Sequence, residues 1–351
     1  MPDLHTIRAG IAELPRGLPL VIALVGATTG IGSYVAKAWA VTFAEHGSKL
    51  RVYIVGRNAA RAEALLKFGR ETSPGSDWRF VQAKDLSVMR EVDEISRAII
   101  QLEETSPFAG GPARLDVLYL SQAQSPLQES RVTPEGLDTQ MSLLYYSRVR
   151  FIQNLTPLLI ASPVSAHVVS IFAGNTEDSV RPGELPIGTP LPDTYGITTV
   201  RRNVTFMKTF LFEELAKVHA GKISFIHIYP GLVDGPVFYI DANPLWFRVA
   251  WQVIKRLMSW YMTSPEVCGQ VMVFLATKRY PAKGAVSEGV EAALSSQHEL
   301  GGGAYAVGQR CDESKVVSWA ALRKENTGKK VWEHTMEQLE QLEAHQVTDQ
   351  H

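Results

Sequence analysis

The chain has 351 residues, 45% of them hydrophobic and 20% charged, with a formal net charge of −1. This composition indicates a large core, and it excludes a bulk field that would favour nucleic acid or an acidic membrane. Cys268 and Cys311 form no ligand motif and the nine histidines show no metal-binding spacing, so we expect reduced thiols and no metal site.

No segment reaches the roughly 18 apolar residues that span a bilayer. The N-terminus also lacks the apolar core of a secretory signal, so we predict a cytoplasmic protein.

Short apolar runs alternate along the chain with segments of helical periodicity. In order, the runs are LPLVIALVG, KLRVYIVGRN, DWRFVQAKDLS, RLDVLYLSQAQ, AHVVSIFAG, KISFIHIYPG and GGGAYAVG. Their β-branched and aliphatic residues are typical of parallel strands buried on both faces. The alternation predicts an α/β fold with a Rossmann-like doubly wound parallel sheet. We expect one domain over 1–351, with its core at about 18–310.

The segments between the runs predict helices, and two insertions interrupt them. Helices are expected at 33–46, 58–69, 87–104, 135–160 and 197–219, with a C-terminal helical tail at 328–351. The first insertion, 175–196, is rich in Pro and Gly and predicts a loop. The second, 241–262, is amphipathic. Its apolar stripe consists of Trp246, Val249, Val253, Leu257 and Trp260.

Three glycines follow the first apolar run at a spacing that suits a nucleotide. Gly26, Gly30 and Gly32 form G-x-x-x-G-x-G between a predicted strand and a predicted helix. Such a turn lets the backbone approach phosphates at a helix N-terminus. Arg57 follows the second run, where a basic side chain can meet the 2′-phosphate of NADP and where an NAD site prefers an acid. The alternative is an arginine that is merely solvated after a strand.

Over about 18–310 the chain resembles the short-chain dehydrogenase/reductase family. The glycine motif resembles that family's T-G-x-x-x-G-I-G, with Val25 in place of Thr, and YPGLV resembles its Pro-Gly segment beside the nicotinamide. The resemblance implies an NADP(H) site, which could also be vestigial. Its residues would be Gly26, Thr28, Thr29, Gly30, Ile31, Gly32, Arg57, Asp85, Leu86, Ser121, Pro230 and Gly231. The lineage resembles reductase-like proteins of fungal secondary metabolism.

The family's catalytic groups are Asn, Ser, Tyr and Lys, and this chain departs from all four. Counting from fixed motifs places Leu144, Ile171, Ile197 and Arg201 at the four positions. SQAQ also replaces the family's Asn-Asn-Ala-Gly after the fourth strand. Arg201 keeps a positive charge but is a poor proton shuttle, because it stays protonated. The candidate substitutes are Tyr195, Ser170 and Arg201, with the loop acids Glu177, Asp178 and Asp193 as further acid or base candidates.

Three functions follow from this pattern. The first is a non-redox enzyme whose apolar pocket, lined by Leu144, Ile171 and Ile197, orients a hydrophobic substrate for isomerisation or cyclisation. The second is an NADP(H)-dependent reductase with a relocated proton donor. The third is a binding protein without catalysis. In each case we expect a hydrophobic small molecule as the partner and no nucleic acid, and a homodimer stays open.

The amphipathic insertion allows two interpretations. It could close over the pocket as a lid, or it could lie on a membrane with Arg248, Lys255 and Arg256 opposite the apolar stripe. The family places its substrate-binding helices at this point of the chain. We therefore expect the lid and no membrane contact.

Overall fold

The computed structural model describes most of the chain. The described residues are 2–44, 47–125, 130–172, 174, 185–239, 243–314, 317 and 319–348. Of the loop acids that the sequence suggests, Glu177 and Asp178 lie outside these residues.

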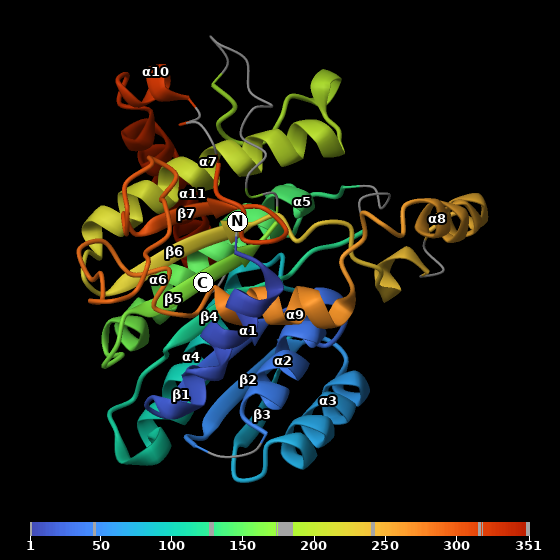
Figure 1. Ribbon diagram of the computed structural model, residues 1–351. Helices are drawn as coiled ribbons and strands as arrows, with labels where there is room; N and C mark the ends of the chain where they lie inside the picture. The colour runs from blue at the N-terminus through green and yellow to red at the C-terminus, as the bar shows by residue number, and fades with distance from the viewer. Residues whose placement is uncertain are drawn as a thin grey trace.

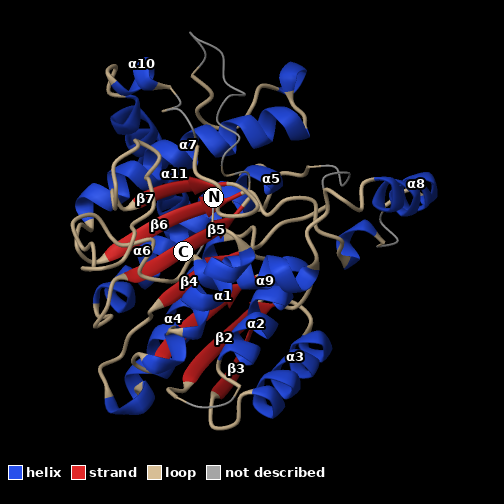
Figure 2. Ribbon diagram, in the orientation of Figure 1, coloured by secondary structure: helices blue, strands red, loops and turns tan. Residues whose placement is uncertain are grey.

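A seven-stranded sheet in the order β3-β2-β1-β4-β5-β6-β7 forms the centre of the fold (Figure 2). All of its pairings are parallel. The strands are β1 (Leu20–Val25), β2 (Leu50–Gly56), β3 (Asp77–Gln82), β4 (Val117–Leu120), β5 (Ala166–Ile171), β6 (Ile223–Ile228) and β7 (Ala304–Val307). Each of the seven apolar runs forms one strand, so the predicted Rossmann-like fold class is confirmed.

Helices cover both faces of the sheet, and each face has its own apolar core (Figure 1). One layer contains α1 (Leu4–Ala12), α2 (Gly30–Thr42), α3 (Ala59–Thr72) and α9 (Pro265–Phe274). The other contains α4 (Met89–Thr105), α6 (Ser147–Ile160), α7 (Ile197–Val218) and α11 (Thr327–Thr348). None of the described helices combines the length and the apolarity needed to cross a bilayer.

The segment expected as one helix at 135–160 is divided into three parts. It begins with α5 (Thr139–Met141), continues as a π-helix over Ser142–Tyr146, and ends with α6. A π-turn has more residues than an α-turn, so it changes which side chains face a neighbouring element. The π-helix therefore decides which of its side chains faces the cavity described below.

Helix α1 was not expected from the sequence. Asp3 caps it by accepting a hydrogen bond from the main-chain nitrogen of Thr6 at 2.7 Å. Ile7 and Ile11 are buried in the core that α9 shares. Gly10 packs so closely that a Cβ there would lie 2.6 Å from the ring of Phe274.

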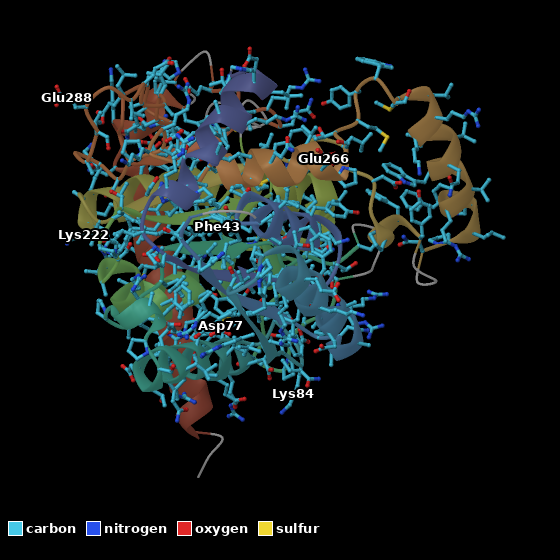
Figure 3. The ribbon with its side chains drawn as sticks, turned by 60° about the horizontal axis from the view of Figure 1, so that its bottom comes forward. Phe43, Asp77, Lys84, Lys222, Glu266 and Glu288 are labelled. Carbon is cyan, nitrogen blue, oxygen red and sulfur yellow. The ribbon has the colours of Figure 1, made fainter. Side chains whose placement is uncertain are left out.

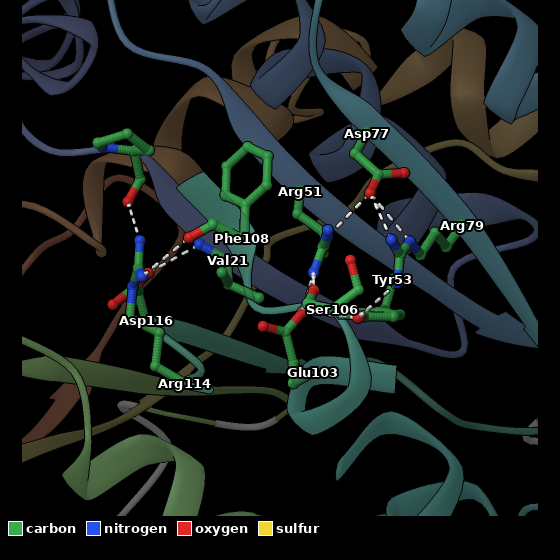
Figure 4. A network of polar contacts seen from close by, with 11 residues as sticks. Val21, Arg51, Tyr53, Asp77, Arg79, Glu103, Ser106, Phe108, Arg114 and Asp116 are labelled. Atoms are coloured by element: carbon green, nitrogen blue, oxygen red, sulfur yellow. Dashed lines mark hydrogen bonds and ion pairs between the residues drawn. The ribbon is translucent and has the colours of Figure 1, made fainter. Parts of the chain in front are cut away.

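A buried polar network occupies the amino ends of the strands (Figure 4). Arg51 donates to Asp77 and Glu103, each at 2.9 Å, and Tyr53 donates to Glu103 at 2.6 Å. Asp116, just before β4, accepts from the main-chain nitrogen of Val21 at 2.7 Å. These charges are paired and hydrogen-bonded, which is what a structural network requires. The carboxyl ends of the strands, in contrast, surround a cavity whose wall includes polar atoms without a partner among the described residues.

Candidate functional site

A cavity of about 670 Å³ lies at the carboxyl ends of the strands. Residues that follow β1, β2, β3, β4 and β6, together with the end of β5, line it. Parallel strands end at the same edge of the sheet, so segments more than 200 residues apart in sequence meet here. The volume falls within the range of about 300–1,000 Å³ that is usual for small-molecule and cofactor sites.

The glycines at one end of the cavity have different roles. A Cβ on Gly26 would lie 2.6 Å from the main-chain nitrogen of Gln122, and one on Gly32 would lie 2.7 Å from Cα of Ala27. These two glycines allow close packing of the backbone. Gly30 has a φ of +58°, and a Cβ there would meet nothing within 4 Å. It therefore leaves open space at the cavity wall, where α2 begins.

The beginning of α2 is suited to an anion. Thr29 is its N-cap residue, and the Thr29 side chain makes no capping hydrogen bond. The first main-chain N–H groups of a helix have no partner within the helix and carry a partial positive charge. With Gly30 leaving the approach open, these groups can receive a phosphate.

The cavity wall beyond β2 is basic. Arg57 and Arg61 are exposed and line the cavity beside Gly56. Asp85 lies after β3 and accepts hydrogen bonds from the main-chain nitrogen and hydroxyl of Ser87, at 2.9 and 2.7 Å. Two arginines and no acid at the end of β2 fit a 2′-phosphate better than a free ribose hydroxyl.

The structure brings the expected cofactor residues together. Eleven of the twelve line this one cavity: Gly26, Thr28, Thr29, Gly30, Ile31, Arg57, Asp85, Leu86, Ser121, Pro230 and Gly231. Gly32 lies behind them, packed against Ala27. The residues present therefore fit NADP(H), whose binding remains a prediction.

Arg148 lies behind the wall of the cavity and was missed by sequence reasoning. It is 1% exposed, and its guanidinium donates to Ser170 Oγ at 2.8 Å. It also donates to the main-chain oxygens of Gln122, Leu143 and Ile171 at 2.7, 3.1 and 3.2 Å. Burial lowers the pKa of Arg148 to about 9, so it stays protonated at neutral pH.

A second buried cationic side chain, Lys208 of α7, lies near Arg148. Its Nζ is 5.7 Å from the centre of the Phe172 ring and has no hydrogen-bond partner among the described residues. Burial, with a smaller contribution from the charge of Arg148, lowers the pKa of Lys208 well below its ordinary value. Burial and Lys208 likewise lower the pKa of His227.

The four aligned catalytic positions do not converge on the cavity as expected. Ile171 lines it, but Leu144 is buried in the core and Ile197 is 42% exposed. Leu143 takes the place expected of Leu144, because the π-helix changes which residue faces the sheet edge. The expected apolar surface of Leu144, Ile171 and Ile197 is therefore wrong for Leu144 and Ile197.

The candidate substitutes are also not among the residues that line the cavity. Ser170 is fully buried and its hydroxyl accepts from Arg148, since it faces the opposite side of β5 from Ile171. The Arg201 guanidinium lies 5.0 Å from the ring centre of Tyr229. Asp193 lies in the 3-10 turn Pro192–Thr194 before α7. A catalytic role for these residues stays a prediction.

Tyr195 is bound to an acid, whereas a family tyrosine would be paired with a cation. Its hydroxyl donates to Asp138 at 3.0 and 3.2 Å from the two carboxylate oxygens. Burial, reinforced by Asp138, raises the pKa of Tyr195 to about 12. The environment therefore opposes ionisation of this tyrosine, which is the reverse of what a lysine neighbour achieves.

Two amides in the cavity wall have polar atoms without a partner. Gln122 Oε1 and Gln124 Nε2 are buried and make no hydrogen bond within the described structure. Gln122 Nε2 is already fixed, donating to Ser147 Oγ at 3.2 Å. An unpaired buried acceptor and donor cost free energy unless a ligand or water meets them. The sequence showed them only as the unusual SQAQ after β4.

The amphipathic insertion forms α8 (Leu245–Leu257), which does not cover the cavity. Trp251 stacks on Phe238 with ring centres 3.8 Å apart and donates to Asp234 at 3.0 Å. Phe238 and Asp234 line the cavity, whereas no residue of α8 does. The stripe of Trp246, Val249, Val253, Leu257 and Trp260 is 55–78% exposed. The expectation of a lid that buries this stripe over the cavity is therefore wrong.

Comparisons with known proteins agree with the fold. No family model matches the chain. It is 51% identical to the short-chain dehydrogenase/reductase SAT2 of Stachybotrys chartarum, covering 99% of both chains. It is 32% identical to an oxidoreductase of Emericella nidulans, covering 97% of this chain and 99% of that one. An L-sorbose reductase of Gluconobacter frateurii, solved with NADPH and L-sorbose, shares the fold at a TM-score of 0.55 and 18% identity, covering 86% and 98%.

Substitution of the two buried basic side chains, Arg148 and Lys208, should change the free energy of unfolding in opposite directions. Arg148→Met leaves the Ser170 hydroxyl and three main-chain oxygens without their donor, so the free energy of unfolding should fall by roughly 3 kcal/mol or more. Arg148→Lys should rescue little of this loss, because one ammonium cannot reproduce the planar guanidinium contacts. Urea unfolding measures both values. Wild-type stability in Arg148→Met would contradict the contacts described.

Lys208→Met should instead raise the free energy of unfolding at neutral pH, by roughly 1–3 kcal/mol, because it removes an unpaired buried amine. Because folding lowers the pKa of Lys208, unfolding takes up protons at pH values between the lowered and the ordinary lysine pKa. The gain should therefore shrink as the pH rises toward the ordinary lysine pKa. Lys217→Met, at an exposed position of the same helix, is the matched control. A destabilised Lys208→Met would show that the amine has a partner.

Proposed function

Since the chain belongs to the short-chain dehydrogenase/reductase family, we propose that it is an NADP(H)-dependent oxidoreductase acting on a hydrophobic carbonyl or alcohol of fungal-type secondary metabolism. One observation carries the proposal. A single cavity joins the open approach at Gly30 and the basic wall at Arg57 to an apolar end at Ile171 and Phe172. The relatives named as oxidoreductases support the same class of reaction.

The cofactor would be held by the residues that line the cavity's polar end. The N-terminus of α2 would receive the pyrophosphate, with Arg57 and Arg61 at the 2′-phosphate and Asp85–Leu86 at the adenine. When bound, the nicotinamide supplies or accepts the hydride. Pro230 and Gly231 lie after β6, where the family resemblance places the nicotinamide.

The substrate end would exclude water and orient the reacting oxygen. Leu143, Ile171 and Phe172 give it an apolar wall. Gln124 also lines the cavity, and its buried Nε2, which has no partner among the described residues, would polarise a carbonyl oxygen. The charge of Arg148 lies behind the main-chain oxygens of Gln122 and Ile171, so it would stabilise negative charge developing in the cavity.

A non-redox isomerase or cyclase is the second candidate. It is favoured by Ile171, an aliphatic side chain at the aligned serine position in the cavity wall, and by the pairing of Tyr195 with Asp138. Such an enzyme would gain its rate from orienting an apolar substrate. Product formation without any change in NADPH absorbance would identify it, whereas equimolar NADPH oxidation and product would identify the reductase.

Gly30→Ala should weaken NADPH binding by about tenfold or more, because the new Cβ enters the space in front of the α2 N-terminus. Fluorescence titration with NADPH measures the Kd. Gly284→Ala is the control, since Gly284 also has a positive φ and open space around it but does not line the cavity. Equal binding by both variants would contradict a phosphate at Gly30. No binding by the wild type at about 1 mM NADPH would exclude the redox proposal.

Arg57→Asp should weaken NADPH binding more than NADH binding, because only NADPH carries the 2′-phosphate that this side chain would meet. The measurement is the ratio of the two Kd values, compared with that of Arg97→Asp at an exposed position on α4. An equal loss for both nucleotides would show that Arg57 does not contact the 2′-phosphate.

A further inference from the structure

The exposed face of α8 is a large apolar surface beside the mouth of the cavity. Trp246, Val249, Val253 and Leu257 of the stripe lie on α8 and are 67%, 58%, 55% and 72% exposed, and Trp260, in the turn after α8, is 78% exposed. Leu245, at the start of the helix, is 68% exposed. Isolated exposed apolar residues are ordinary, but a continuous stripe of this kind marks an interaction surface.

The opposite face of α8 is fixed to the body of the protein. Trp251 stacks on Phe238, and both Trp251 and Lys255 donate to Asp234, at 3.0 and 2.7 Å. Figures 1 and 3 show α8 standing clear of the helices that cover the sheet. These contacts hold the apolar stripe outward, away from the cavity.

The charged residues near the stripe indicate which kind of partner binds it. Between Asn243 and Pro265 the chain carries Arg248, Lys255 and Arg256 and no acidic residue. Lys255 is paired with Asp234 at 2.7 Å, whereas Arg256 is exposed. An anionic lipid surface is complementary to the apolar stripe and to Arg256. Tryptophans at both ends of the stripe suit the boundary between headgroups and acyl chains.

We propose that α8 docks the protein on anionic phospholipid membranes, with its apolar stripe in the headgroup region. This contact does not depend on the NADP(H) site. If the proposed function is also correct, docking would hold the cavity one helix away from the bilayer, because Phe238 and Asp234 both line the cavity and contact α8.

Co-sedimentation of the full chain with vesicles, without nucleotide, tests the proposal. We expect binding to vesicles of phosphatidylcholine with phosphatidylserine, and at least about tenfold weaker partitioning to phosphatidylcholine alone. The double variant Val253→Gln/Leu257→Gln should lose about tenfold or more of the binding. Arg256→Gln should reduce binding only to the anionic vesicles.

The matched control is Val41→Gln/Val218→Gln, which changes two exposed valines on α2 and α7 and should bind vesicles like the wild type. Absence of vesicle binding by the wild type would overturn the proposal. So would wild-type binding by Val253→Gln/Leu257→Gln. A wild-type dimer that this variant converts to a monomer, with no vesicle binding, would show instead that the stripe pairs two copies. NADPH titration in parallel reports separately on the cofactor site.

Discussion

The buried guanidinium of Arg148 joins the parts of the chain that form the back of the cavity. It connects the π-helix through Leu143, the end of β4 through Gln122, and the end of β5 through Ser170 and Ile171. Arginine can do this because its planar fork offers five donors in fixed directions. The side chains on the cavity side of these segments can therefore be apolar or amide, since a residue behind them fixes the backbone.

This arrangement also sets the charge of the site. None of the described acidic residues forms an ion pair with Arg148, and Lys208 and His227 have lowered pKa values beside it. The charge of Arg148 therefore remains behind the cavity wall, in a medium that screens it poorly. A cavity with this charge behind it and two arginines at its rim suits an anionic dinucleotide. The amino edge of the sheet differs, because Arg51 and Arg114 are paired there with carboxylates.

The sequence was sufficient for the sheet and for most of the nucleotide end, because both depend on local patterns. Each strand is a short apolar run, and the glycine motif spans the turn after β1 and the start of α2. Arg148 was missed because it follows no family motif and lies within an apolar helical pattern. Leu144 was misplaced because counting positions along the sequence does not show which side chains the π-helix turns toward the cavity. The stripe on α8 was recognised, but periodicity shows which residues share a face and not what covers that face.

Asp234 lines the cavity and contacts α8, and its carboxylate must be charged to form an ion pair with Lys255 of α8. Burial acts to raise its pKa, but hydrogen bonds from Lys255, Trp251 and Tyr239 outweigh burial and lower it. The carboxylate is thus charged at neutral pH and holds α8 by two hydrogen bonds. Its main-chain oxygen accepts from Tyr34 of α2 at 3.0 Å, and Tyr34 also lines the cavity. Helix α8, which carries most of the exposed apolar stripe, and helix α2, whose N-terminus would receive the phosphate, therefore both contact Asp234. A displacement of either helix would shift the other, because these hydrogen bonds are short and directional.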